Sequence, residues 1–109
     1  MEHIEDYIAN SLVVGSPEWD VIVNATKLAG IHVALAFSER IDDNIYMGQT
    51  LLGPNGTTLL HRQKLRPTGS ERDIFSDGYV EGLAVANTSI GRITMLQCWE
   101  HLKVRTMIG

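Results

Sequence analysis

The sequence has little of what several common protein classes require. It contains a single cysteine in 109 residues, so an intrachain disulfide cannot form and a small disulfide-stabilised secreted scaffold is excluded. No stretch approaches the ~18 apolar residues of a membrane-spanning helix. The acidic segment after Met1 has neither the basic start nor the apolar run of a signal peptide. We therefore expect a cytoplasmic protein that has no membrane partner.

Metal sites and nucleic-acid sites are not predicted either. The four histidines are about thirty or more residues apart, and neither HExxH nor CxxC occurs, so no pair has metal-ligand spacing on one helix face. The formal net charge is −4, and the basic residues form no stripe along the sequence. We expect no metal, no cofactor and no nucleic-acid partner.

Apolar residues make up 44% of the sequence and charged residues 20%, which is typical of one ordinary globular domain, here residues 1–109. Apolar spacing predicts the end of a helix over residues 2–10. Ser16 and Pro17 predict the start of a second helix, because serine caps free N–H groups and proline suits the first helical position; Gly30 predicts its end. The apolar face expected on this second helix comprises Trp19, Ile22, Val23, Ala25, Leu28 and Ala29.

The middle of the chain is predicted to form strands. Residues 31–37 are an almost unbroken apolar run, which is typical of a central strand covered on both faces. Glycine, proline and asparagine at residues 53–56 predict a tight turn. The strands on either side of that turn, 44–52 and 57–63, are therefore expected to pair as an antiparallel hairpin.

The last third is expected to begin with a long loop over residues 66–79, and long ordered loops are often functional. Strands 80–86 and 92–97 should follow, and a helix should begin at Trp99. Helices followed by strands in this order predict a layered α/β or α+β protein.

Two residues at predicted strand ends are candidates for chemistry. Cys98 ends a strand and precedes a helix, where backbone N–H groups and the helix dipole favour a reactive thiolate. The alternative is a buried, inert cysteine. Lys64 ends a strand just before the long loop, where its ammonium could stabilise an oxyanion or move a proton. The alternative is a surface lysine.

Two carboxylates follow these candidates in the sequence. Glu71 or Glu100 could orient the lysine or a water molecule. The alternative is that both are solvated acids, with Glu100 favouring the start of the last helix and Glu71 forming an ordinary surface pair with Arg72.

Four segments of the sequence together resemble the nitrilase and cyanide hydratase family of carbon–nitrogen hydrolases. Residues 29–40 resemble the family segment AGVYVVLGFSER, and residues 61–68 resemble its lysine motif, HRKLKPT. Glu71-Arg72 matches an ER pair. Gly91-Arg92, followed by residues 96–100, resembles a GR turn that leads into the nucleophile motif CWE. The resemblance covers residues 5–103, and the 34 positions from Lys64 to Cys98 agree with the family spacing.

The resemblance implies a fold, a mechanism and a set of site residues. The family fold is a four-layer αββα sandwich about twice as long as this chain, so we expect a partial sandwich that is truncated at both ends. Cys98 would be the nucleophile that forms a thioimidate with the nitrile, Lys64 the catalytic lysine and Glu71 the second glutamate. The products would be a carboxylic acid and ammonia, or an amide, without a cofactor. Glu100-His101 resembles cyanide-degrading members, so cyanide is a possible substrate alongside small nitriles.

Two functions from different classes remain open. The first is a nitrile hydrolase, expected as a homo-oligomer or in association with homologous subunits. The family's base glutamate precedes the segment matched here, so the 109 residues alone are expected to be inactive. The second is a non-catalytic, truncated homologue that only associates with full-length subunits.

Overall fold

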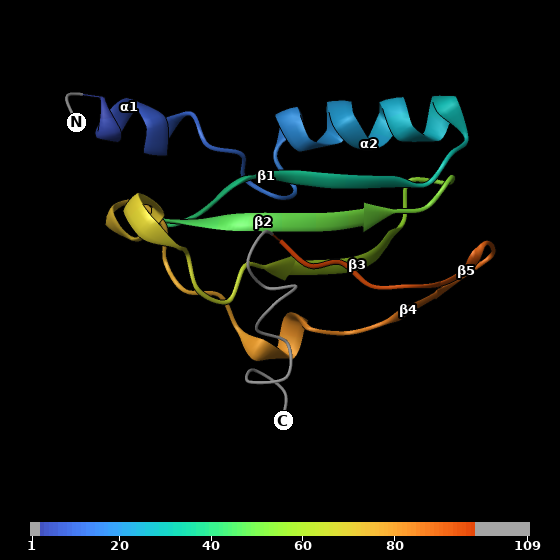
Figure 1. Ribbon diagram of the computed structural model, residues 1–109. Coiled ribbons are helices and arrows are strands. Elements are labelled where there is room, and N and C mark those ends of the chain that lie inside the picture. The colour runs from blue at the N-terminus through green and yellow to red at the C-terminus, as the bar shows by residue number, and fades with distance from the viewer. Residues whose placement is uncertain (1–2, 98–109) are drawn as a thin grey trace.

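The computed structural model describes residues 3–97, which form a mixed α/β structure with antiparallel sheets, as the sequence predicted (Figure 1). The elements in chain order are the helices α1 (Ile4–Ala9) and α2 (Pro17–Ala29), the strands β1 (Val33–Ile41), β2 (Asn44–Leu52) and β3 (Thr58–Gln63), the short 3₁₀ helices η1 (Gly69–Asp73) and η2 (Val80–Gly82), and the strands β4 (Ala86–Thr88) and β5 (Gly91–Ile93). No helix among these described residues is long and apolar enough to cross a membrane.

Helix α2 begins and ends where the sequence predicted. The Ser16 hydroxyl accepts the Trp19 N–H at 3.3 Å, and Pro17 is the first helical residue. Gly30 ends the helix in the left-handed conformation with φ 66°, which a residue without Cβ adopts readily. These signals are local, so the sequence alone located both ends of this helix.

The apolar face predicted for α2 was too broad. Trp19 and Thr26 are buried and the Trp19 ring lies 5.3 Å from that of Phe37 on β1, but Leu28 is 90% exposed. Leu28 follows Trp19 by about two and a half turns and so points away from the sheet. Ala25 and Ala29 are exposed as well. The helix covers the sheet with one narrow stripe only.

The three-stranded sheet has the order β1-β2-β3, and all its pairs are antiparallel (Figure 1). The predicted hairpin of β2 and β3 is confirmed. The prediction that residues 31–37 form a central strand is wrong, because β2 is central and β1 lies at the edge of the described sheet. Among residues 3–97, the backbone of the outer edge of β1 pairs with Leu12, whose N–H donates to the Ser38 carbonyl and whose carbonyl accepts the Arg40 N–H.

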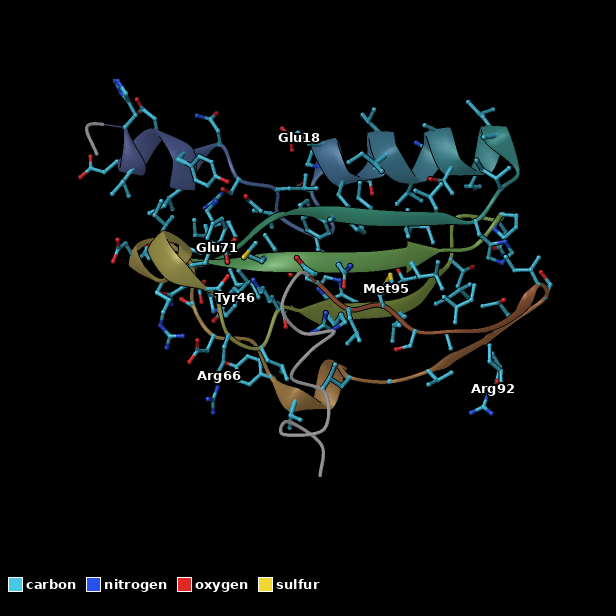
Figure 2. All side chains as sticks on the ribbon, in the orientation of Figure 1. Glu18, Tyr46, Arg66, Glu71, Arg92 and Met95 are labelled. Atoms are coloured by element: carbon cyan, nitrogen blue, oxygen red, sulfur yellow. The ribbon has the colours of Figure 1, made fainter. Side chains whose placement is uncertain are left out.

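The face of the sheet opposite α2 is covered by the last described segment. Leu51 of β2 and Leu60 of β3 form a buried cluster with Ala86 and Met95, and Met95 points toward the sheet (Figure 2). The sheet therefore lies between α2 on one side and the β4–β5 segment on the other (Figure 1).

Residues 80–97 differ from the prediction. The expected strand 80–86 is instead η2 followed by the three-residue strand β4, and the expected strand 92–97 is shortened to β5. Gly82 lies so close to β3 that a Cβ there would come within 2.8 Å of the Arg62 Cβ, so the chain packs against β3 at this point without extended pairing. The predicted loop 66–79 contains η1. The predicted helix from Trp99 lies outside the described residues.

Candidate functional site

Lys64 follows β3, and both its backbone N–H and its backbone carbonyl form hydrogen bonds. Its N–H donates to the Met47 carbonyl at 2.8 Å, which continues the β2–β3 ladder, and its carbonyl accepts the Gly78 N–H at 3.0 Å. Its side chain is 0% exposed. The alternative of a surface lysine is therefore excluded.

The buried ammonium of Lys64 is paired with Glu71. Lys64 Nζ lies 2.9 Å from Glu71 Oε1 and 3.2 Å from the Thr68 hydroxyl. Glu71 also accepts the Thr68 N–H at 2.8 Å, which completes a capping box at the start of η1. Figure 2 shows Glu71 on η1, at the end of the sheet. The structure thus brings together Lys64 and Glu71, two of the three residues to which the resemblance assigns a role.

The environment of Glu71 stabilises its charged form. The Thr68 N–H, followed by Lys64, lowers the pKa of the Glu71 carboxyl, although partial burial acts in the opposite direction. The alternative of a surface pair between Glu71 and Arg72 does not hold, because Glu71 pairs with Lys64 and the Arg72 guanidinium donates to the Pro67 carbonyl at 3.0 Å. Glu71 is therefore a carboxylate that fixes a buried cation.

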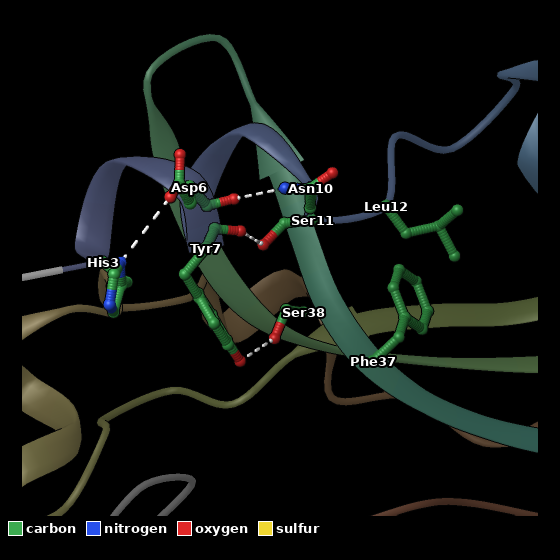
Figure 3. Close-up of a pocket in the computed structure, with 8 residues that line it drawn as sticks. All are labelled: His3, Asp6, Tyr7, Asn10, Ser11, Leu12, Phe37 and Ser38. Carbon is green, nitrogen blue, oxygen red and sulfur yellow. Dashed lines mark hydrogen bonds and ion pairs between the residues drawn. The ribbon is translucent and has the colours of Figure 1, made fainter.

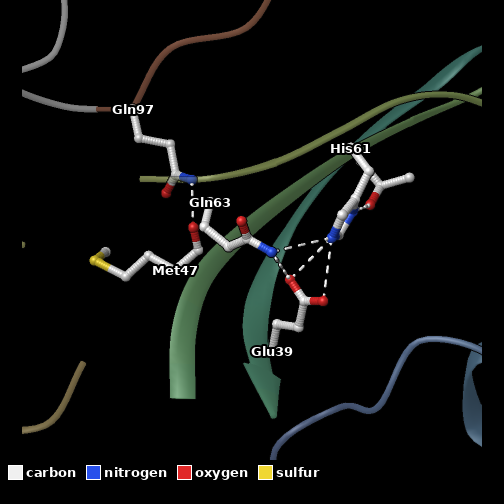
Figure 4. Close-up of polar contacts among 6 residues, drawn as sticks. Glu39, Met47, His61, Gln63 and Gln97 are labelled. Carbon is white, nitrogen blue, oxygen red and sulfur yellow. Dashed lines mark hydrogen bonds and ion pairs between the residues drawn. The ribbon is translucent and has the colours of Figure 1, made fainter. Parts of the chain in front are cut away.

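The end of the described chain returns to the strand beside Lys64. The side-chain amide of Gln97 donates to the Met47 carbonyl at 2.8 Å, the same oxygen that accepts the Lys64 N–H (Figure 4). Gln49, the second neighbour of Met47 along β2, donates to the Leu96 carbonyl at 3.5 Å. Cys98 and Glu100 lie outside the described residues.

A second polar cluster was not singled out from the sequence. Glu39 of β1 accepts hydrogen bonds from His61 and Gln63 of β3 (Figure 4). His61 Nδ1 lies 2.6 Å from the Thr50 hydroxyl. One sequence signal was available. Glu39 follows Phe37 by two positions, so the two share a face of the strand, and a charged residue on an inward face requires a partner.

Thr50, His61 and Glu39 have the connectivity of a hydroxyl nucleophile, a base and an orienting acid. The hydroxyl of Thr50 is not accessible, however, because the residue is 0% exposed. A substrate cannot reach it without opening the sheet, so this cluster is structural.

A pocket of about 510 Å³ lies between α1 and β1 (Figure 3). Its polar groups bond mainly to one another, as the Tyr7 and Ser38 hydroxyls do at 2.6 Å and Ser11 does to the Tyr7 carbonyl at 2.8 Å. Neither Lys64 nor Glu71 lines it. Within residues 3–97, no three histidine, cysteine or acidic side chains gather as a metal site requires.

Comparison of the sequence with known proteins identifies relatives of this chain. The carbon–nitrogen hydrolase family matches residues 2–108. The arylacetone-specific nitrilase of Alcaligenes faecalis is 45% identical over 96 residues, 88% of this chain and 27% of the relative. The nitrilase of Talaromyces marneffei is 41% identical over 101 residues, 92% of this chain and 31% of the relative. The cyanide hydratase of Armillaria gallica is 39% identical over 101 residues, 92% of this chain and 28% of the relative. The chain thus spans 27–31% of the length of these relatives.

Proposed function

This chain belongs to the carbon–nitrogen hydrolase family, and we propose that the protein that contains it hydrolyses a small nitrile or hydrates cyanide. The observation that carries the proposal is the fully buried Lys64, whose ammonium is fixed by Glu71 at 2.9 Å. A buried cation with one carboxylate partner is suited to stabilising negative charge that develops during a reaction.

In the proposed reaction, the Cys98 thiolate attacks the nitrile carbon and a C–S bond forms. The nitrile nitrogen gains electron density and takes up a proton, which gives a thioimidate. Lys64 stabilises that nitrogen, and Glu71 holds Lys64 or a water molecule in place. Gln97 and Lys64 both donate to the Met47 carbonyl. This shared acceptor supports the proposed role of Cys98, the next residue in the sequence, as the nucleophile.

Water then adds to the thioimidate carbon. Loss of ammonia leaves a thioester, which a second water molecule hydrolyses to a carboxylic acid and the free thiol. Loss of the thiol instead releases an amide. The resemblance assigns the base for these steps to a glutamate outside the 109 residues, so we propose that this chain by itself does not turn over nitriles.

The relatives' names guide the choice of substrates for testing. One matching relative is an arylacetone-specific nitrilase, another an arylacetonitrilase and another a cyanide hydratase. We therefore propose phenylacetonitrile and hydrogen cyanide as the first two candidates. The protein that contains the chain should release acid and ammonia from phenylacetonitrile, or formamide from cyanide.

The decisive experiment compares lysine variants in that protein. Lys64→Ala should reduce turnover to background, because the developing charge loses its donor, and Cys98→Ala should do the same. Lys27→Ala is the matched control, since Lys27 is exposed in the last turn of α2. Near-normal turnover by Lys64→Ala, or no turnover of any nitrile or of cyanide by the parent protein, would overturn the proposal.

The alternative, a non-catalytic homologue that associates with full-length subunits, rests on exposed apolar side chains. Val21 and Leu28 on α2 point away from the sheet and are exposed, and exposed apolar surface favours association. For the enzyme, too, we propose that copies associate with one another. We propose the cytoplasm as its location. Light scattering after size exclusion, combined with the turnover assay, separates an active oligomer from an inactive partner.

A further inference from the structure

The carboxylate of Glu39 connects the two outer strands of the sheet. Glu39 belongs to β1 and is only 4% exposed. It follows Phe37 by two positions and so shares the face on which the Phe37 ring meets Trp19 of α2. Its Oε1 lies 3.0 Å from His61 Nε2 and accepts the Gln63 side-chain amide at 3.1 Å, while its Oε2 lies 3.1 Å from His61 Nε2 (Figure 4). Both partners belong to β3, so one carboxylate bridges from β1 to β3 across the central strand.

Gly48 makes this bridge possible. It lies on β2 between the two partners, opposite Phe37 on one side and Gln63 on the other. A Cβ at Gly48 would come within 3.1 Å of Glu39 Oε1 and 3.2 Å of Glu39 Cβ. Gly48 does not adopt a positive φ, so its missing side chain, rather than a special backbone conformation, leaves the path for the carboxylate.

His61 is held at both ring nitrogens. When Nε2 carries the hydrogen and donates to Glu39, Nδ1 accepts the hydroxyl of Thr50 at 2.6 Å. The ring therefore cannot rotate without losing a bond to a buried group, and such losses are costly. Glu39 thus fixes the positions of two β3 side chains, His61 and Gln63.

Gln63 is the residue immediately before Lys64. Successive residues along a strand point to opposite faces, and the Lys64 N–H continues the β2–β3 ladder. Glu39 therefore restrains the end of β3 from one face, while the Lys64 ammonium meets Glu71 on the other.

We propose that Glu39 is a positioning residue for Lys64, acting across Gly48 through His61 and Gln63. Glu39 does not contact the ammonium, so its effect is to keep the end of β3 in the place from which Lys64 reaches Glu71. The catalytic consequence rests on the proposed function, whereas the effect on Lys64 itself does not.

The test uses Glu39→Gln, which keeps the shape of the side chain but replaces one acceptor oxygen with a donor. The protein that contains the chain is labelled with ¹⁵N at the lysine side-chain nitrogens and measured by NMR. The resonance of the Lys64 ammonium is identified because it is missing from the spectrum of Lys64→Arg. Glu39→Gln should shift or broaden that resonance. It should also lower kcat about 10- to 100-fold, with KM changed by less than about threefold, because small misplacements of a catalytic group have effects of this order.

Two further variants separate positioning from folding. Gly48→Ala keeps every charge and places a methyl group against the Glu39 side chain and the Phe37 ring. It should therefore change the resonance and kcat in the same direction but less. Gly53→Ala is its matched control, because a Cβ there would meet Leu59 Cδ1 at a similar 3.3 Å without approaching Glu39. Glu18→Gln, at an exposed position in the first turn of α2, controls for the loss of a carboxylate and should leave both readouts unchanged.

The outcomes distinguish the two proposals. An unchanged Lys64 resonance and unchanged kcat in Glu39→Gln and in Gly48→Ala would overturn the positioning role. A parent protein that turns over no substrate would overturn the proposed function, and the ammonium resonance would still decide the role of Glu39. If Glu39→Gln fails to fold, Gly48→Ala decides between a positioning role and none.

Discussion

The ammonium of Lys64 lies 2.9 Å from a carboxylate oxygen of Glu71, yet the two side chains differ sharply in exposure, at 0% for Lys64 and 31% for Glu71. The two halves of this ion pair are therefore not equivalent. Without Glu71, a buried cation loses its charged partner. Without Lys64, the carboxylate still reaches water and still bonds to Thr68.

This asymmetry predicts different stabilities for the two single variants. Glu71→Ala should lower the free energy of unfolding by about 3 kcal/mol, the cost of leaving a buried charge uncompensated. Lys64→Met, which is apolar and of similar size, should cost about 1–2 kcal/mol. Urea unfolding of the protein that contains the chain measures both, with Glu18→Ala expected within about 0.5 kcal/mol of the parent. If Lys64→Met lowered the free energy of unfolding more than Glu71→Ala does, the prediction drawn from the exposure difference would be wrong.

The pH dependence of stability follows from the lowered pKa of Glu71. A carboxylate whose pKa is lowered by folding stabilises the folded state above its ordinary value of 4.5, and this contribution is lost as the pH falls below that value through the folded pKa. The melting temperature of the parent should therefore exceed that of Glu71→Gln above pH 4.5, and the gap should close at lower pH. If the difference in melting temperature instead widened as the pH falls, the predicted direction of the pH dependence would be wrong.

The proposed covalent chemistry predicts a trapped intermediate. Brief exposure of the protein to phenylacetonitrile should add the mass of the nitrile to Cys98, because the thioimidate forms by addition. The adduct should accumulate most in Glu71→Gln if Glu71 positions water for the second step, and it should be missing in Cys98→Ala. Intact-mass spectrometry with peptide mapping locates the adduct, and labelling at another residue would exclude Cys98 as the nucleophile.

The cap of α2 provides a test of local stability away from the site. Ser16→Ala removes the hydroxyl that accepts the Trp19 N–H and should lower the free energy of unfolding by about 1 kcal/mol. Ser89→Ala, at an exposed turn position, should stay within about 0.5 kcal/mol. Turnover should be unchanged in both variants, because neither residue contacts Lys64 or Glu71. Equal destabilisation by the two changes would argue against the cap.

The sequence by itself determined those features that depend on neighbours along the chain. Ser16, Pro17 and Gly30 located α2, and the turn at residues 53–56 located the β2–β3 hairpin, because capping, proline geometry and turn conformations act over a few residues. The motif around Lys64 and Glu71 pointed to the family. The importance of Glu39 was not recognised, because its partners are 22 and 24 positions away in the sequence.

Only the tertiary structure decided which strand is central, how far Lys64 is buried and where Glu39 finds its partners. An apolar run such as residues 31–37 fits an edge strand under a helix as well as a central strand, because burial depends on what the rest of the chain places against it. The same holds for Leu28, which is apolar but lies opposite the face that α2 presents to the sheet. Gly48 became meaningful only when strand pairing placed it between Glu39 and Gln63, since the space that a missing side chain leaves is defined by neighbours that the sequence does not place.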